Sequence, residues 1–467
     1  ATEDPMAGEH SAPPPATSPG SGDHSASVIA ARLDRLPVSR WHRRVVVLIG
    51  LGSFCNLFEI SLSTYFGVLL GNQWTLSTLQ RALIIAALFP GEMIGSIVLA
   101  PLADRLGRRT LFQVNLLTYA VLSLATAFAP NLATFLVLRM CTGIGLGAEL
   151  TLVDTYLGEL LPAARRGRYL CWAYTVGLLA APVAGGLATA ANTAIGGLAG
   201  WRWLLILSAV GGLAVWLLRR RLPESPRWLA ATGNTAEADR VLTAIEREVR
   251  TDPDLSVPAT VLPPVPARGV VDPPPTRPYR RRNVLMWVMQ IISPIGFYAF
   301  ASIAPIVLLT KGFDLAHSLT YSALSALGCP LGSLASVYLT ERFERRTLLI
   351  AATLAVAAFG VMFGLATTIA LVIVAGVATT ISTVLHSNFT HIYQAELFHT
   401  ANRSTAIGVA YAASRLVGAM LPLSALTLLS AIGSGGLYAC CALLLSCLAI
   451  AIRLLGPRTN NQQLDTI

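Results

Sequence analysis

Asp104-Arg105-Leu106-Gly107-Arg108-Arg109 follows one long apolar stretch of this chain, and Glu341-Arg342-Phe343-Glu344-Arg345-Arg346 follows another. The two hexapeptides begin 237 residues apart, since 341 − 104 = 237. Both place an acidic residue before a group of arginines, in a short break between apolar segments. The pair predicts that the chain contains a duplicated unit.

A second charge motif repeats with the same spacing. Glu159 and Arg166 recur as Glu396 and Arg403, and 396 − 159 is again 237. Two separate motifs with one offset support a duplication that divides the chain into halves. Parallel repeats of this kind are a known architecture of membrane transporters.

The composition points to the same class of protein. Of the 467 residues, 54% are hydrophobic and only 12% are charged, and the mean hydropathy is +0.62. Soluble domains carry about 25% charged residues, so we exclude an ordinary soluble enzyme. A helix that crosses a bilayer needs about 20 apolar residues, and the chain has room for twelve such spans with loops.

The predicted fold is an all-α membrane protein with 12 transmembrane helices in two pseudo-symmetric six-helix bundles. The twelve apolar segments lie at about 45–70, 82–103, 111–129, 132–158, 169–190, 201–218, 284–309, 320–340, 347–366, 369–393, 404–430 and 435–455. The predicted domains are a disordered tail (1–30), a first bundle (31–218), a Pro-rich central loop (219–283), a second bundle (284–456) and a C-terminal tail (457–467).

The net charge of +10 follows from topology, because the arginines gather in the short loops on one side of the twelve segments. Cytoplasmic loops of membrane proteins carry such an excess of basic residues. We therefore predict cytoplasmic termini, a multi-pass protein of the cell inner membrane, and contact with lipid but not with nucleic acid. The seven cysteines lie in apolar segments without metal-ligand spacing, so we predict no metal site.

These motifs make the chain resemble the major facilitator superfamily over residues 40–457. Arg139-x3-Gly143-x-Gly145-x-Gly147 in the fourth segment also fits, and Pro223-Glu224-Ser225-Pro226-Arg227-Trp228-Leu229 is typical of the sugar-porter and organic-ion branch. Within that branch, two stretches are most similar to bacterial metabolite:proton symporters, the group with niacin and aromatic-acid carriers. They are Phe54–Glu59 and the stretch from Phe297 through Pro305 to Phe313. The resemblance implies alternating access driven by a proton gradient, without a cofactor.

Charged residues inside membrane spans are costly and mark functional sites. Glu59 is the first candidate for proton coupling, and Glu149 is the second. The alternative for Glu59 is permanent neutralisation by an arginine of a neighbouring helix. Arg139 matches a family residue that is implicated in proton coupling.

Arg415 lies near the middle of the eleventh segment, where its guanidinium could bind a substrate carboxylate with two hydrogen bonds. The alternative is a structural ion pair with Glu59, Glu92 or Glu149. An aromatic acid would also find stacking faces and hydrogen-bond donors nearby. The further candidates for substrate binding are Asn56, Tyr298, His386, Asn388 and Tyr411.

The repeated charge motifs have a separate role by family resemblance, as a network that latches the outward-facing state. In the first half the network comprises Asp104, Arg105, Arg108, Glu159 and Arg166. In the second half it comprises Glu341, Arg345, Glu396 and Arg403.

The predicted function is proton-coupled uptake of a small organic anion, such as an aromatic or pyridine carboxylate, by a monomeric carrier with no enzymatic activity. The partners are then the organic solute, protons and membrane lipid. Three alternatives stay open: a sugar:proton symporter, a proton-coupled exporter, and a membrane sensor that transports nothing.

Overall fold

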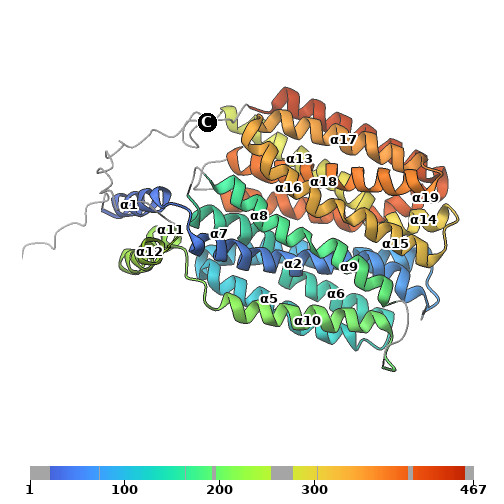
Figure 1. Cartoon of the computed structure of the whole chain (residues 1–467), viewed down its shortest axis with the longest axis horizontal. Coiled ribbons are helices and arrows are strands. Elements are labelled where there is room, and N and C mark those ends of the chain that lie inside the picture. The colour runs from blue at the N-terminus through green and yellow to red at the C-terminus, as the bar shows by residue number, and fades with distance from the viewer. Residues whose placement is uncertain are drawn as a thin grey trace, which may run out of the picture.

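A computed structural model describes residues 21–72, 74–162, 165–191, 196–253, 277–301, 303–397 and 403–457. Almost all of these residues are helical, and the long helices run side by side in two groups (Figure 1). The proline-rich part of the central loop and both chain ends lie outside the described residues, so the prediction for these segments is not addressed by the structure.

The first bundle contains six spans, and three of them are each divided into two helices. Its helices are α2 (Arg40–Leu69), a short 3-10 turn η1 (Leu70–Asn72), α3 (Thr78–Ala86), α4 (Leu88–Leu106), α5 (Arg108–Ala127), α6 (Leu132–Leu146), α7 (Glu149–Leu160), α8 (Arg166–Leu178), α9 (Ala180–Ala190) and α10 (Gly200–Arg219). The pairs α3–α4, α6–α7 and α8–α9 each form one membrane-crossing segment.

The second bundle also consists of long helices, but its breaks do not all lie at the places where the first bundle has them. Its helices are α13 (Arg277–Ala301), α14 (Ala304–Thr310), α15 (Leu315–Ala326), α16 (Gly328–Arg342), α17 (Arg345–Leu365), α18 (Ile369–Leu397) and α19 (Arg403–Leu455). Helix α19 changes direction at Gly433, whose φ is 70°. A bilayer crossing needs about 20 residues, so the 46-residue apolar stretch Ala410–Leu455 contains two spans.

The predicted fold class is confirmed. The described residues contain eleven helices that are long and apolar enough to cross a membrane, and the division of Ala410–Leu455 raises the number of spans to twelve. The seventh span differs from the prediction of 284–309, because α13 ends at Ala301 and α14 begins at Ala304. Pro305 lies in the first turn of α14, where its missing N–H and fixed φ start a new helix instead of extending the old one.

The N-terminal boundary is a second correction. We predicted a disordered tail to residue 30, but α1 (Ser21–Arg35) begins ten residues earlier. Ile29 and Leu33 are buried on it and pack against Leu229 and Leu242, which lie on α11 (Pro226–Ala231) and α12 (Thr235–Arg250). The polar composition of the tail does not predict this helix. Its few apolar residues are buried only because the central loop packs against them.

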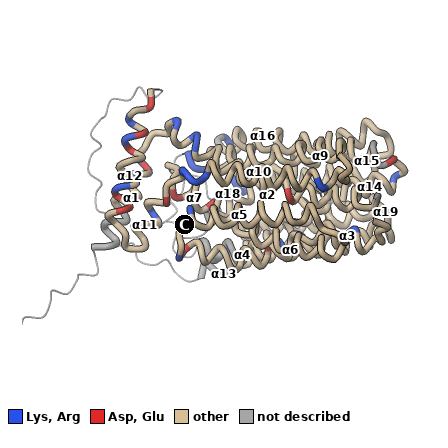
Figure 2. The backbone as a smooth tube through the Cα atoms, turned by 90° about the horizontal axis from the view of Figure 1, so that it is seen from below, with Lys and Arg blue, Asp and Glu red and all other residues tan. Residues whose placement is uncertain are grey.

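Charged residues gather at the end of the molecule that carries α1, α11 and α12, while the middle of both bundles is almost free of them (Figure 2). We call this the charged end. Arg32 of α1 donates to Glu246 at 2.9 Å and to Asp239 at 2.5 Å on α12. Hydrogen bonds to Glu246 raise the pKa of the Arg32 guanidinium above its ordinary value. Charge and apolar burial together attach the first helix to the central loop.

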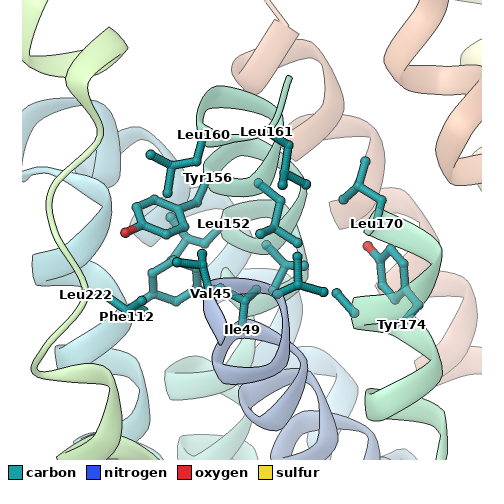
Figure 3. Packing of buried hydrophobic residues seen from close by; sticks show 14 of the residues in the cluster. Val45, Ile49, Phe112, Leu152, Tyr156, Leu160, Leu161, Leu170, Tyr174 and Leu222 are labelled. Atoms are coloured by element: carbon teal, nitrogen blue, oxygen red, sulfur yellow. The ribbon is translucent and has the colours of Figure 1, made fainter. Parts of the chain in front are cut away.

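A buried apolar cluster fills the first bundle near the charged end (Figure 3). In it Ile49 of α2, Phe112 of α5 and Tyr156 of α7 meet, and the ring planes of Phe112 and Tyr156 are almost perpendicular, with centroids 5.5 Å apart. The Tyr156 hydroxyl donates to the carbonyl oxygen of Pro223 at 2.6 Å. This packing fixes α7, and with it the side chains that α7 directs toward the centre of the molecule.

Candidate functional site between the two bundles

A cavity lies between the two bundles. A second chamber adjoins it, and the two share Leu57, Ile60, Leu178, Phe297 and Tyr298. Residues of both bundles therefore line both chambers, and a solute bound there would contact the two halves at once.

Arg415 of α19 lines this cavity and pairs with Glu92 of α4. Its Nε lies 3.1 Å from Glu92 Oε2 in this ion pair, and its guanidinium donates a hydrogen bond to the Tyr298 hydroxyl at 2.5 Å. Arg415 is 5% exposed and Glu92 is fully buried. The structural alternative for Arg415, a pair with Glu92, is thus present, and the ion pair joins the two bundles.

Several polar atoms in the cavity wall have no hydrogen-bond partner among the residues that the structure describes. In the first chamber these are Ser293 Oγ, His386 Nε2 and Thr390 Oγ1, and in the second they are Ser322 Oγ and Thr383 Oγ1. All five belong to the second bundle. Buried polar groups are normally satisfied, so these atoms are suited to bind a polar solute. The other wall of the first chamber, from the first bundle, is mostly apolar and includes Leu57, Ile60 and Leu150.

Five of the six predicted substrate-binding residues line the first chamber, namely Tyr298, His386, Asn388, Tyr411 and Arg415. Asn56 does not line either chamber, since its side-chain amide donates to the Leu146 carbonyl oxygen at 3.2 Å inside the first bundle. Sequence reasoning missed Gln290, which hydrogen-bonds to Gln394 in the cavity wall. Spacing along α13 could have indicated it, because Gln290 lies one turn before Ser293 and on the same face.

Glu59 is completely buried and forms an ion pair with Arg139 of α6. Its other carboxylate oxygen accepts hydrogen bonds from Ser123 at 2.7 Å and from Ser208 at 2.8 Å. Arg139 also donates to Ser63 Oγ at 2.5 Å. Glu59 therefore lies within the first bundle, behind the cavity wall, and next to Ile60, which faces the cavity.

Glu149 forms a second buried ion pair, with Arg219 at 2.8 Å. The Arg219 guanidinium donates to the carbonyl oxygens of Leu48 and Ile49 and lies 4.4 Å from the centre of the Phe112 ring. Arg219 is the first residue of the predicted central loop, so the sequence does not indicate this role. A buried acid in a neighbouring span was the available signal, because such a group requires a partner.

The predicted latch residues of the first half do meet at the charged end. Arg108 pairs with Asp104 at 2.8 Å and with Glu159 at 3.0 Å, and it donates to the Ala103 carbonyl oxygen at 2.8 Å. Arg105 is exposed. Arg166 lies 3.7 Å from Asp34 of α1, a partner that the sequence did not suggest.

In the second half, Arg345 donates to the Thr340 carbonyl oxygen at 2.7 Å. This contact reproduces that of Arg108 with Ala103, because both residues are shifted by 237. The side chains of Glu341, Glu396 and Arg403 lie outside the described residues.

Glu224 secures the turn that precedes α5. Its carboxylate accepts backbone hydrogen bonds from Arg108 at 3.0 Å and from Ser225 at 3.0 Å. Gly107 adopts a φ of 95°, and an added Cβ would lie 2.3 Å from Glu224 Oε2. Burial raises the pKa of the Glu224 carboxyl, and the backbone donors oppose this shift.

Comparison with known proteins gives a consistent result. The profile of the family described as "Sugar (and other) transporter" matches residues 51–467. The metabolite transport protein YyaJ of Bacillus subtilis is 30% identical over 94% of this chain and 98% of its own length. The niacin transporter NiaP of Acinetobacter baylyi is 25% identical over 94% of this chain and 99% of its own length.

Solved structures agree in fold. The xylose transporter XylE from E. coli, in a partially occluded inward-open conformation, covers 91% of this chain and 100% of its own with a TM-score of 0.72. The sequence identity is 16%, so this likeness concerns the arrangement of the helices alone.

Proposed function

Because the chain belongs to the family of sugar and other transporters in the major facilitator superfamily, a multi-pass family of membrane carriers, we propose that it takes up a small organic anion together with protons. The substrate class is an aromatic or pyridine carboxylate, bound in the cavity between the bundles. Uptake proceeds by alternating access, in which the two bundles rock about this site. The chain is a transporter and not an enzyme.

The observation that carries the proposal is the Arg415 guanidinium in the cavity wall. Breaking a buried ion pair by removal of one partner costs about 3–5 kcal/mol, so Arg415 requires a carboxylate at every stage. Glu92 supplies it in this structure, at 3.1 Å from the opposite bundle. A substrate carboxylate that replaces Glu92 would free the two bundles from each other at this point, and it would thereby couple binding to rocking.

The rings around Arg415 support an aromatic substrate. Phe297, Tyr298, Tyr174 and Tyr411 all line the first chamber. Flat rings stack or pack edge to face on such side chains. The unpartnered atoms of Ser293 and His386 lie in the same chamber, where they can bind a ring nitrogen or a hydroxyl group.

The Glu59–Arg139 pair supports proton coupling. Protonation of Glu59 would remove the charge that holds Arg139, and α2 would then be free to move relative to α6. Helix α2 also lines the cavity, through Leu57 and Ile60. The proton and the substrate would therefore act on two sides of the same helix, without sharing a site.

We place the charged end at the cytoplasm, because basic residues of membrane proteins favour that side. Helix α1 lies there (Figures 1 and 2), and so does the end of α19, because Arg346 of the repeated charge motif donates to the Gly456 carbonyl oxygen. The proposed location is the inner membrane, and the proposed active form is a monomer in contact with lipid.

The test uses the purified chain in liposomes that contain a pH-sensitive dye. Addition of nicotinate, benzoate or a hydroxybenzoate outside should acidify the interior if the substrate enters with protons. Acidification by xylose or glucose instead would replace the proposed substrate class with sugars. Uptake into liposomes with an acidic interior, and not otherwise, would establish an exporter, and binding without any transport would favour a sensor.

A further inference from the structure

Asp154 and His391 contact each other between the bundles, with Asp154 Oδ2 3.3 Å from His391 Nδ1. They are 237 residues apart, which is the offset of the two charge motifs. The two residues therefore hold the same position in the two repeats. Equivalent residues of a parallel repeat can touch only near the axis that relates the two halves, so this contact lies on the pseudo-twofold axis.

Two tyrosines complete the arrangement and obey the same offset, since 411 − 174 = 237. The Tyr174 hydroxyl donates to Asp154 Oδ1 at 2.6 Å, and the Tyr411 hydroxyl lies 2.6 Å from His391 Nδ1. Each half thus makes the same contact. The His391 ring also packs against both phenol rings, with centroid distances of 4.9 Å to Tyr174 and 5.7 Å to Tyr411. We call these four residues the axial quartet.

The axial quartet joins the two bundles on the side of the cavity that faces the charged end. His391, Tyr174 and Tyr411 line the first chamber together with Arg415. Tyr174 lies on α8 beside Leu170, in the apolar cluster that fills the charged end of the first bundle (Figure 3). Next to it, Thr175 and Ser333 form another hydrogen bond across the bundles, at 2.7 Å. An opening at this end must separate Asp154 from His391.

The two equivalent positions of the duplication carry different residues, an acid and a base. Two aspartates at these positions would repel each other, and two neutral imidazoles would carry no attraction of opposite charges. With one acid and one base, a single proton decides whether the pair carries opposite charges. A protonated imidazole is a cation that attracts the carboxylate, whereas the neutral ring carries no charge, whichever of its two nitrogens keeps the proton.

We propose that the axial quartet is a proton-binding site whose proton, held between His391 and Asp154, keeps the cavity closed at the charged end. This inference rests on the alternating access of the proposed function, but it is separate from coupling at Glu59. When the proton is bound, the bundles are joined by a charge-assisted hydrogen bond. When the proton leaves, the attraction is lost and the charged end is free to open.

The other titratable groups around His391 belong to three described elements. Helix α8 contributes Tyr174, α19 contributes Tyr411 and Arg415, and α18 itself contributes His386, which interacts electrostatically with His391. The charge of Arg415 is balanced by Glu92. Neighbouring α13 contributes the neutral Gln290. The carboxylate of Asp154 on α7 is therefore the anion in direct contact with the imidazole.

The experiment measures the separation of the two halves at the charged end as a function of pH. Thr110 and Thr347 are exposed near the starts of α5 and α17, and they too are 237 residues apart. Cysteines at both positions would carry spin labels, in the full chain with the cysteines that are not buried, Cys141, Cys440 and Cys447, replaced by Ala. The distance between the two spin labels is then measured by double electron–electron resonance, without substrate. The measurements run from about pH 5 to pH 8, the range in which an imidazole titrates.

We expect the fraction of molecules with a short distance between the spin labels to fall as the pH rises. The ratio of closed to open molecules should change by up to about tenfold per pH unit, which is the slope of a one-proton transition. His391→Gln and Asp154→Asn should each abolish this dependence. The double variant Asp154→His with His391→Asp should restore it, because the exchange preserves the pair. Thermal unfolding of each variant shows that loss of the response is not loss of the fold.

Three results would overturn the inference. The first is a distance distribution in the unmodified quartet that does not change with pH. The second is a full pH response in Asp154→Asn or His391→Gln, and the third is an exchanged pair that stays insensitive to pH. Glu59→Gln should keep the response, so its loss there would assign the proton to Glu59 instead. The liposome assay tests substrate and coupling separately, so failure of the proposed function is distinguishable from failure of this inference.

Discussion

Arg415 and Glu92 form a buried ion pair that crosses from one bundle to the other, with Nε of Arg415 3.1 Å from Oε2 of Glu92. Neither side chain has another charged partner among the contacts that the structure describes at hydrogen-bond distance. The pair can therefore dissolve only when another group replaces one of its members. This relationship makes opposite predictions for the two residues.

For Glu92→Gln, we expect the unliganded protein to lose stability, because the Arg415 guanidinium is left without its carboxylate. The loss should approach the cost of about 3–5 kcal/mol for breaking a buried pair. A carboxylate substrate should restore more stability than it does in the unmodified chain, and it should bind more tightly because its competitor is gone. Thermal unfolding with and without nicotinate or benzoate measures both effects.

Arg415→Lys is the matched variant, since it keeps the charge and removes the planar donor pair. Binding of a carboxylate substrate should weaken about tenfold or more, which corresponds to about 1.4 kcal/mol. Unchanged affinity in Arg415→Lys would show that the substrate is held elsewhere in the cavity.

Glu59→Gln tests the proton. The amide keeps the size of the side chain and can still accept from Ser123 and Ser208, but it cannot carry a charge to Arg139. We expect substrate exchange across the liposome membrane to continue, while internal acidification and accumulation against a gradient disappear. Ser63→Ala removes one donor contact of Arg139 and leaves the carboxylate intact, so it should retain acidification. If Glu59→Gln still acidifies the interior, the coupling site lies at another residue.

Gly52→Ala tests the second buried pair. An added Cβ would lie 1.9 Å from the Arg219 guanidinium and 2.5 Å from Glu149 Oε1, so the pair must move or break. We expect a loss of about 3 kcal/mol or more in stability. Gly158→Ala is the control, because no atom of the described residues lies within 4 Å of its added Cβ. Equal unfolding temperatures for the two variants would contradict the conclusion that the absence of a side chain at Gly52 leaves room for the Arg219 guanidinium.

The sequence predicts the fold better than the site, and particular residues show why. Twelve spans could be predicted because the length and apolar composition of each segment are enough to identify it as a membrane span. The offset of the repeated motifs then divides these spans into two bundles. The partners of buried charges depend on how helices rotate against one another, which no single segment specifies. Glu59 was correctly recognised as an intramembrane acid, but only the packing of α2 against α6 brings Arg139 to it.

The same reason explains Arg219 and α1. Arg219 follows an apolar stretch, so composition assigns it to the central loop. Helix α1 lies in a polar stretch, so composition assigns much of it to the N-terminal tail. Arg219 is fully buried because α10 continues to it and Gly52 leaves space. The duplication, in contrast, does specify some of the contacts between helices. The offset of 237 already related Asp154 to His391 and Tyr174 to Tyr411, and the structure shows that these positions meet.

Glu224 gives a prediction about pH at the charged end. Burial raises the pKa of its carboxyl, so the folded protein binds a proton there more readily than the unfolded chain does. A carboxyl with a raised pKa contributes most to stability at a pH below its ordinary value of about 4.3, and this contribution is lost as the pH rises through the shifted pKa. Glu224→Gln keeps one acceptor oxygen for the backbone N–H groups of Arg108 and Ser225 but removes the ionisation. We therefore expect the difference in unfolding temperature between variant and unmodified chain to shift in favour of the variant as the pH increases from about 4. A difference that stays constant over this range, or shifts in favour of the unmodified chain, would show that the backbone donors outweigh burial and stabilise the carboxylate.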